Sequence, residues 1–177
     1  MSASAGHKML YAITLLAFLA LALYFPYWWF GVVPFGVDDR VSQSEIEQLL
    51  AGKNLPDYYA EPLPEISDEE YAAQKAAFMW CRFCHTLKHG EENKVGPNLY
   101  RIFGNPAAVV AGFPYSGSFI EARENGLVWT PENMAALIAA PHKLVPGNRM
   151  RYPPMLFYED NPERQQRMLQ FVLRETR

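Results

Sequence analysis

Two cysteines three positions apart, followed at once by a histidine, occur near the middle of the chain as Cys81-Arg82-Phe83-Cys84-His85. On one helical turn the two sulfurs can reach the two vinyl groups at one edge of a porphyrin, and the histidine then lies under the iron as its proximal ligand. The motif therefore predicts one covalently attached haem c, held by Cys81 and Cys84 and ligated by His85. A chain with this motif has to fold around a porphyrin.

A thioredoxin-like redox dithiol or a zinc site is the alternative meaning of two such cysteines. A redox dithiol is typical of a βαβ context with a strand before the motif. Here the residues before Cys81 follow a helical pattern, and the chain has no further cysteine. We therefore favour haem attachment, and because both sulfurs would become thioethers, no disulfide is expected.

A long apolar segment near the N-terminus predicts a membrane span. Residues 9 to 37 carry no charge, and Met9 to Phe30 is almost entirely apolar, which is long enough to cross a hydrocarbon core of about 30 Å. Lys8 precedes the segment, and Asp38 and Asp39 follow it. The positive-inside bias therefore predicts a single-pass protein of the cell inner membrane, with its N-terminus in the cytoplasm and the rest of the chain in the periplasm.

A cleaved signal peptide is the alternative, since Ala20-Leu21-Ala22 resembles a small-residue cleavage site. A dense aromatic group lies at the end of the segment, of the kind that anchors a helix at a membrane interface. The group comprises Tyr24, Phe25, Tyr27, Trp28, Trp29 and Phe30. We therefore expect a retained anchor.

Charge is distributed unevenly beyond the anchor. Residues 31 to 66 contain seven acids against Arg40 and Lys53, whereas from Ser67 onward twelve acids meet thirteen bases. The formal net charge of the whole chain is −3, which by itself points to no nucleic-acid partner. The sequence thus predicts an acidic connection to a nearly neutral domain.

The acidic connection, residues 31 to 66, is predicted to be a tether. Ser42 to Leu50 has the pattern of a short helix, capped by Ser42 or Ser44. The three prolines between Asn54 and Ile66 favour an extended, solvated segment.

Helix signals dominate the rest of the chain, and no strand pattern or internal repeat is evident. Ser67 with Glu70 forms a capping box that predicts a helix to Cys81. Further helices are predicted over Ser116 to Asn125, from Thr130-Pro131 to about Ala140, and from Asn161-Pro162 to about Glu175. The predicted fold class is mainly α, with a cytoplasmic N-terminus (1–8), a transmembrane anchor (9–30), a tether (31–66) and a haem domain (67–177).

A haem that carries electrons needs a second axial ligand, and a methionine thioether raises the potential and keeps the iron low-spin. Of the seven methionines, Met150 and Met155 lie in a proline-bracketed loop, away from the anchor, the attachment site and the predicted helices. Pro146-Gly147 is a tight turn that can present Met150 to the iron. We prefer Met150, and Met155 is the alternative.

From Ser67 to Arg177 the chain resembles a class I cytochrome c, and within that class the mitochondrial type and its bacterial membrane-bound relatives. The matching stretches, in the family's order, are CRFCHTLKHG, VGPNLYRIFG, AGFPYSGSF, LVWTPENM and LVPGNRM. The resemblance implies the class I cytochrome c fold, one covalent haem c and transfer of single electrons, without catalysis.

The resemblance also implies roles for individual residues. His85 and Met150 would ligate the iron, and the Pro97 carbonyl would accept a hydrogen bond from the other ring nitrogen of His85. The remaining matches are Tyr115, Ser116 and Trp129, at positions in contact with or near the haem propionates, and Asn148, near the methionine.

Some positions depart from the family pattern. Asn105 replaces an arginine of the mitochondrial type, and Leu137 replaces a tyrosine that lies near the methionine sulfur. Ala73 and Ala77 replace the glycine and the aromatic residue before the first cysteine. The contact between the first and last helices of the domain must therefore be repacked, and Phe78 is the candidate to do it.

The predicted function is that of a membrane-tethered carrier in a respiratory chain, passing electrons from a quinol-oxidising complex to a terminal oxidase or another acceptor. A fixed subunit of a larger respiratory or photosynthetic complex is the first alternative. A haem enzyme such as a peroxidase is the second, which a bound Met150 argues against. Docking is expected at the exposed haem edge, where the surrounding cations would steer an acidic partner: Arg82, Lys88, Lys94, Lys143, Arg149 and Arg151.

Overall fold

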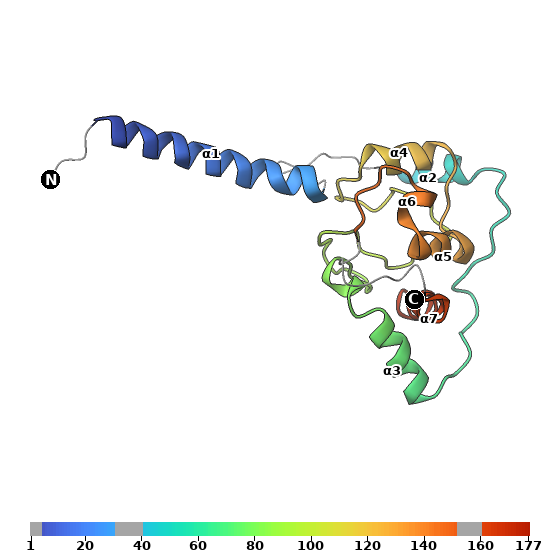
Figure 1. The fold of residues 1–177 in the computed structure, drawn as a ribbon. Coiled ribbons are helices and arrows are strands. Elements are labelled where there is room, and N and C mark those ends of the chain that lie inside the picture. Colours follow the sequence, from blue (N-terminus) through green and yellow to red (C-terminus); the bar gives the residue numbers. More distant parts are fainter. Residues whose placement is uncertain (1–4, 31–40, 152–160) are drawn as a thin grey trace.

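The computed structural model describes residues 5–30, 41–151 and 161–177 (Figure 1). Its helices are α1 (Ala5–Phe30), α2 (Gln43–Leu50), α3 (Asp68–Ala77), α4 (Gly117–Glu124), α5 (Pro131–Ala139), α6 (Pro141–Leu144) and α7 (Pro162–Glu175), with a 3₁₀ turn, η1, at Cys81–Phe83. Among these residues the extended pairing is one isolated bridge, between Pro106 and Val128. The mainly α fold class is confirmed.

Helix α1 projects away from the rest of the described chain (Figure 1). Within it, Gly6–Phe25 forms an apolar stretch of 20 residues with a mean hydropathy of 1.9, none of it buried against the protein. Its length and composition suit a membrane span, and a signal sequence would look the same. Most of the predicted aromatic group, Tyr27, Trp28, Trp29 and Phe30, lies outside the side chains that the structure describes.

The predicted starts of two helices are confirmed by their capping contacts. The Ser42 hydroxyl accepts a hydrogen bond from the Glu45 amide, and the Glu45 carboxylate accepts one from the Ser42 amide, which makes a reciprocal capping box at α2. At α3, the Ser67 hydroxyl accepts from the Glu70 amide at 3.2 Å. Each contact satisfies a backbone donor that the first helical turn leaves without an intrahelical partner.

Thr130 and Asn161 cap α5 and α7 as predicted. Their side-chain oxygens accept from backbone amides three residues ahead, at 3.2 Å and 3.0 Å. A proline follows each cap at the first helical position, where its missing N–H costs no hydrogen bond.

The prediction that the helix from Ser67 continues to Cys81 is wrong, since α3 ends at Ala77. Beyond it the hydrogen bonds shorten to three-residue spacing, from the Met79 amide to Ala76 and from the Cys81 amide to Phe78. The chain then passes into η1. This tighter winding is a frequent way for a helix to end, and here it leads directly into the turn that carries the cysteines.

The core is built where α7 packs against α3 and α5. The Phe171 ring of α7 lies 5.2 Å from the Phe78 ring and 6.1 Å from the Tyr71 ring. Met168 and Val172, on the same face of α7, are also buried. The repacking through Phe78, expected from the alanines at 73 and 77, is therefore confirmed.

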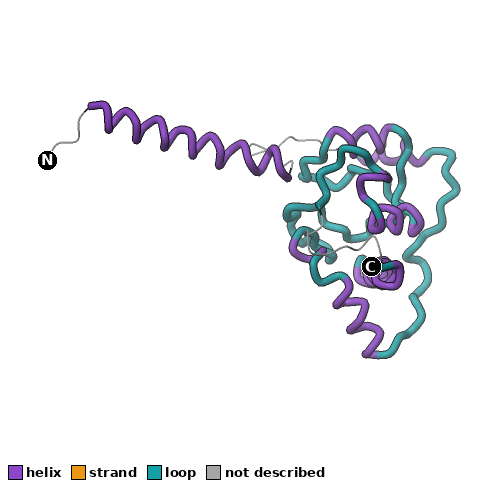
Figure 2. The backbone as a smooth tube through the Cα atoms, viewed as in Figure 1, coloured by secondary structure: helices purple, strands orange, loops and turns teal. Residues whose placement is uncertain are grey.

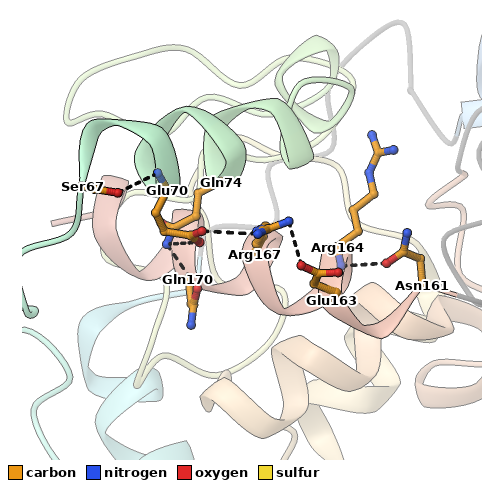
Figure 3. Close-up of polar contacts among 8 residues, drawn as sticks. All are labelled: Ser67, Glu70, Gln74, Asn161, Glu163, Arg164, Arg167 and Gln170. Atoms are coloured by element: carbon orange, nitrogen blue, oxygen red, sulfur yellow. Dashed lines mark hydrogen bonds and ion pairs between the residues drawn. The ribbon is translucent and has the colours of Figure 1, made fainter.

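Polar contacts join α3 and α7 along the edge of this apolar interface (Figure 3). Gln74, only 2% exposed, donates through Nε2 to Glu70 and to Gln170, each at 3.2 Å. Arg167 lies 3.4 Å from the Glu70 carboxylate and 3.1 Å from that of Glu163. These partly exposed ion pairs contribute little free energy, so the apolar contacts carry the stability of the interface.

Replacing Phe171 by alanine is expected to lower the free energy of unfolding by about 3–5 kcal/mol, because it leaves a cavity between α3 and α7. Urea denaturation of the haem-loaded protein measures the change. Phe83→Ala is the matched control, since that ring is 61% exposed and its loss should stay within about 0.5 kcal/mol. Equal losses in the two variants would contradict the assigned core.

Residues 41–66, which we call the strap, lie along the body of the domain. Figures 1 and 2 show them passing from α2 down one side of the molecule to the start of α3. Tyr58 and Tyr59 pack against the buried cluster. This part of the predicted tether is therefore attached to the domain, whereas composition alone favoured a solvated segment.

Candidate functional site

The Cys81–His85 motif is held in one compact turn. The amides of Cys84 and His85 both donate to the Cys81 carbonyl, at 3.0 Å and 2.9 Å. Both cysteine side chains are partly exposed. The Cys81 sulfur lies 4.0 Å from the sulfur of Met168, so the buried face of α7 sets the position of the first cysteine.

The protein surroundings of the two cysteines do not activate them as a redox dithiol. Burial raises the pKa of the Cys81 thiol to about 12, and burial also raises the pKa of Cys84 above its usual value against the opposing charge of Lys94. A catalytic dithiol has its pKa lowered instead, so that a thiolate is available near neutral pH. Thioether formation removes this acidity altogether.

His85 is oriented by the hydrogen bond that the sequence predicted. Its Nδ1 lies 2.8 Å from the Pro97 carbonyl oxygen. Burial lowers the pKa of His85, although the hydrogen bond to Pro97 opposes the shift. Because a carbonyl oxygen can only accept, the proton of the neutral ring belongs on Nδ1, and Nε2 keeps the lone pair that an iron ion requires.

Gly96 gives the ring of His85 its room. A Cβ atom on residue 96 would overlap the ring carbon Cε1 of His85 and lie 2.7 Å from each ring nitrogen. The Gly96 amide donates to the Cys84 carbonyl at 2.8 Å, so its backbone crosses directly over the motif. Two thiols on one turn, a neutral imidazole with Nε2 available and this glycine together fit a covalently attached haem.

Met150 ends a loop whose shape is set by a turn. Pro146 and Gly147 occupy the middle of that turn, Gly147 has φ +78°, and the Asn148 amide donates to the Val145 carbonyl at 3.2 Å, as in a type II turn. The side chain of Met150 is partly buried against the core cluster. The alternative ligand, Met155, lies outside the described residues, as do residues 152–160 as a whole.

Asn148 has a role in this loop that sequence reasoning missed. Its side chain is 1% exposed. The amide nitrogen donates to the carbonyls of Pro141 and Val145, each at 2.7 Å, and the amide oxygen accepts from the Met150 amide at 2.8 Å. Asn148 thus holds the backbone that presents Met150, and its predicted place beside the haem remains a prediction.

Three further predicted site residues lie on either side of α4. Ser116 directly precedes α4 without a capping hydrogen bond from its side chain, and its hydroxyl lies 2.9 Å from that of Ser118. Burial raises the pKa of the Tyr115 hydroxyl, with the Val110 backbone and the charge of Arg123 opposing the shift. Trp129 is 6% exposed. An aromatic series joins Tyr115 to Trp129 through Phe119, with ring separations of 6.2 Å and 6.2 Å.

Asn105 and Leu137, which depart from the family pattern near the expected haem pocket, both fit into the structure. The Asn105 side chain donates to the Arg101 carbonyl at 2.7 Å, and its backbone carbonyl accepts from the Trp129 amide at 2.9 Å. Leu137 is buried in the core cluster. Asn105 therefore closes a loop instead of supplying a cation, and Leu137 adds to packing.

Comparison with known proteins identifies relatives of the chain. It is 41% identical to a cytochrome c2 of Agrobacterium tumefaciens over 81 residues, which is 46% of this chain and 73% of the relative. It is 34% identical to a cytochrome c of Cochliobolus lunatus over 87 residues, 48% of this chain and 78% of the relative. A match to a cytochrome c2 of Rhodospirillum rubrum, 39% identical over 80 residues, covers 45% of this chain and 59% of that protein.

Among solved structures, cytochrome cH from Methylobacterium extorquens is similar at 28% identity and a TM-score of 0.48, over 58% of this chain and 95% of that one. No protein-family model matches the chain. The sequence relatives share enough of their length with residues of this chain to establish the relationship. The chain belongs to the class I cytochrome c family, and it carries one covalently attached haem c with which it transfers electrons.

Proposed function

We propose that this cytochrome c is anchored in the inner membrane by α1 and passes single electrons, on the periplasmic side, from a quinol-oxidising complex to a terminal oxidase or another acceptor. The observation that carries the proposal is α1 itself, whose apolar stretch Gly6–Phe25 is wholly unburied. Such a surface is not stable in water, so the helix needs a lipid environment. In this proposal residues 1–8 are the cytoplasmic end, 9–30 the anchor and 67–177 the haem domain, and of the predicted tether (31–66) residues 41–66 pack against that domain.

The haem is proposed to be held by Cys81 and Cys84 and ligated by His85 and Met150. Pro97 orients His85. Tyr115, Ser116, Trp129 and Asn148 complete the proposed pocket. When bound, the haem supplies the one-electron chemistry, and a methionine ligand keeps the iron closed to exogenous ligands, which disfavours peroxidase activity.

The docking surface is proposed to surround the haem motif. The six cations expected there are Arg82, Lys88, Lys94, Lys143 and Arg151, which are exposed, and Arg149, which is partly exposed. Lys88 forms an ion pair with Glu175 at 3.0 Å, and Lys94 donates to the Arg82 carbonyl at 2.9 Å. Steering by the exposed charges would raise the rate of association with an acidic partner.

Apolar side chains are also exposed close to the motif in the sequence. Beyond α1, the described residues expose three large apolar side chains, Met79, Phe83 and Val95, which are 43%, 61% and 40% exposed. Phe83 packs on Trp80 at 5.6 Å, and Val95 adjoins Gly96, whose amide is bonded to Cys84. An apolar centre within a charged rim is the usual anatomy of a protein interface.

Membrane fractionation tests the anchor. The full chain, matured with haem, is expected to stay in the membrane pellet after a carbonate wash, whereas a variant with residues 1–30 replaced by a cleavable secretion signal should be released with the same haem spectrum. Haem absorbance in each fraction, with the N-terminal mass of the full chain, measures both. Full-length chains that lose their N-terminal residues and become water-soluble would show that α1 is a signal peptide.

A further inference from the structure

The strap, residues 41–66, is fastened to the domain near its beginning. Ile46 of α2 lies at a hollow of about 280 Å³ that is also lined by Tyr100, Ile102 and Val110. A few residues on, the Lys53 ammonium donates to the Gly126 carbonyl at 3.2 Å. The strap thus meets two separate parts of the domain before its prolines begin.

Tyr59 is the centre of the attachment. Its hydroxyl accepts from the Phe103 amide at 3.0 Å and lies 3.3 Å from the hydroxyl of Thr176. Thr176 is fully buried and donates its own proton to the Val172 carbonyl, so Tyr59 is the donor to Thr176. The Tyr59 hydroxyl is therefore satisfied on both sides by the body of the domain.

Arginine side chains donate hydrogen bonds to backbone carbonyls of the strap. Arg177 donates to the carbonyl of Tyr58 at 3.0 Å and to that of Glu61 at 2.7 Å. Arg174 donates to the Pro64 carbonyl at 3.0 Å. Arg101 and Arg177 also lie 4.8 Å and 5.7 Å from the centre of the Tyr59 ring. Hydrogen bonds from charged donors are stronger than neutral ones, and here they come from Arg174 in α7 and from Arg177, just beyond α7.

We infer that the strap is a permanent part of the haem domain and that it shortens the link between membrane and domain to residues 31–40. The inference rests on the proposed function, since the link has meaning only if α1 stays in the membrane. Ten residues can span at most about 36 Å, whereas the whole segment 31–66 could span about 130 Å. Attachment of the strap removes most of the reach that a free tether of this length would have.

The short link between membrane and domain limits which partners the haem domain can contact. It fits an integral membrane redox protein whose electron-exchange site lies close to the same bilayer surface, at a position beside the anchor. A short link also holds the domain at a high effective concentration near such a partner and excludes partners beyond its span. The strap therefore favours a carrier that works within a membrane assembly over one that swings between distant complexes.

Energy transfer from a labelled bilayer to the haem tests the reach. The full-length haem protein is inserted in phosphatidylcholine vesicles that contain a trace of lipid with a fluorescent headgroup, which the haem quenches more strongly at shorter distance. The wild type is expected to quench strongly. Tyr59→Ala, which frees the strap, should lose part of this quenching, and Glu47→Gln, at an exposed strap residue, should not.

A second variant leaves the strap intact and lengthens only the link, by twelve Gly and Ser residues inserted between Gly36 and Val37. It should lose quenching as Tyr59→Ala does. If the wild type does not float with the vesicles, the proposed anchoring fails. If it floats but quenches no more than the insertion variant, the anchoring stands and the short reach is overturned.

Trypsin cleavage after Lys53 checks the attachment itself, and it covers the case in which Tyr59→Ala does not fold. Proteolysis follows the population of the open strap. Arg177→Ala removes the hydrogen bonds to the Tyr58 and Glu61 carbonyls. It is expected to speed this cleavage about tenfold, with an unchanged haem spectrum. Equal cleavage rates in the wild type and Arg177→Ala would show that the strap is not held as inferred.

Discussion

Met150→Ala is expected to lower the reduction potential of the haem by on the order of 0.2 V and to abolish the weak near-infrared sulfur-to-iron band of the oxidised protein. The thioether stabilises ferrous iron, so its removal favours the ferric state. The opened coordination position should also let the reduced variant bind carbon monoxide readily. Potentiometric titration and the absorption spectrum of the oxidised protein measure these effects.

Met155→Ala is the matched control, because it removes the other loop methionine that the sequence offers as a ligand. It should leave both the potential and the near-infrared band unchanged. The opposite pattern, with the band lost in Met155→Ala and kept in Met150→Ala, would show that Met155, which lies outside the described residues, is the axial ligand. The loop geometry set by Asn148 would then serve packing alone.

Gly96→Ala is expected to reduce the free energy of unfolding by about 3 kcal/mol or more. The added methyl would overlap the ring carbon Cε1 of His85, so either the ring or the backbone would have to shift. The ring cannot simply move away, because His85 Nδ1 is hydrogen-bonded to the Pro97 carbonyl and the His85 amide is hydrogen-bonded to the Cys81 carbonyl. Denaturation followed by haem absorbance measures the loss.

Gly117→Ala is the control for this substitution. Gly117 is the first residue of α4, and nothing lies within 4 Å of the Cβ that it would gain. Alanine should leave stability unchanged or raise it by about 0.4–1 kcal/mol, because it restricts the unfolded chain. If Gly96→Ala is as stable as Gly117→Ala, the ring of His85 has more room than the geometry indicates.

The starts of the helices were predictable because their causes are local. A capping oxygen and the amide it satisfies lie three residues apart, as in Ser67 and Glu70 or Asn161 and Arg164, so a short window contains the whole interaction. The end of α3 was not predictable in this way. No glycine or proline stops the helix, and Phe78, at its end, packs on Phe171 in α7.

In the haem site, too, the features with local causes were predictable and those that depend on distant contacts were not. The spacing of Cys81, Cys84 and His85 predicts haem attachment from five residues alone. The Gly96-Pro97 turn that follows can also be predicted, because this dipeptide is a turn signal. That Gly96 has to be a glycine becomes evident only when the ring of His85 lies over it. The role of Asn148 was missed because its partners are backbone carbonyls, which leave no trace in residue type.

Haem attachment, an apolar helix of membrane-spanning length before the domain and the starts of most helices could all be predicted from the amino-acid sequence. These features depend on residue types at fixed short spacings, which any fold would preserve. The packing of residues 41–66 against the domain, in contrast, became evident from the folded structure alone. Composition described them as an acidic, proline-containing tether, but Tyr59 binds Phe103 and Thr176. Contacts between such distant residues arise from packing, and no local pattern encodes them.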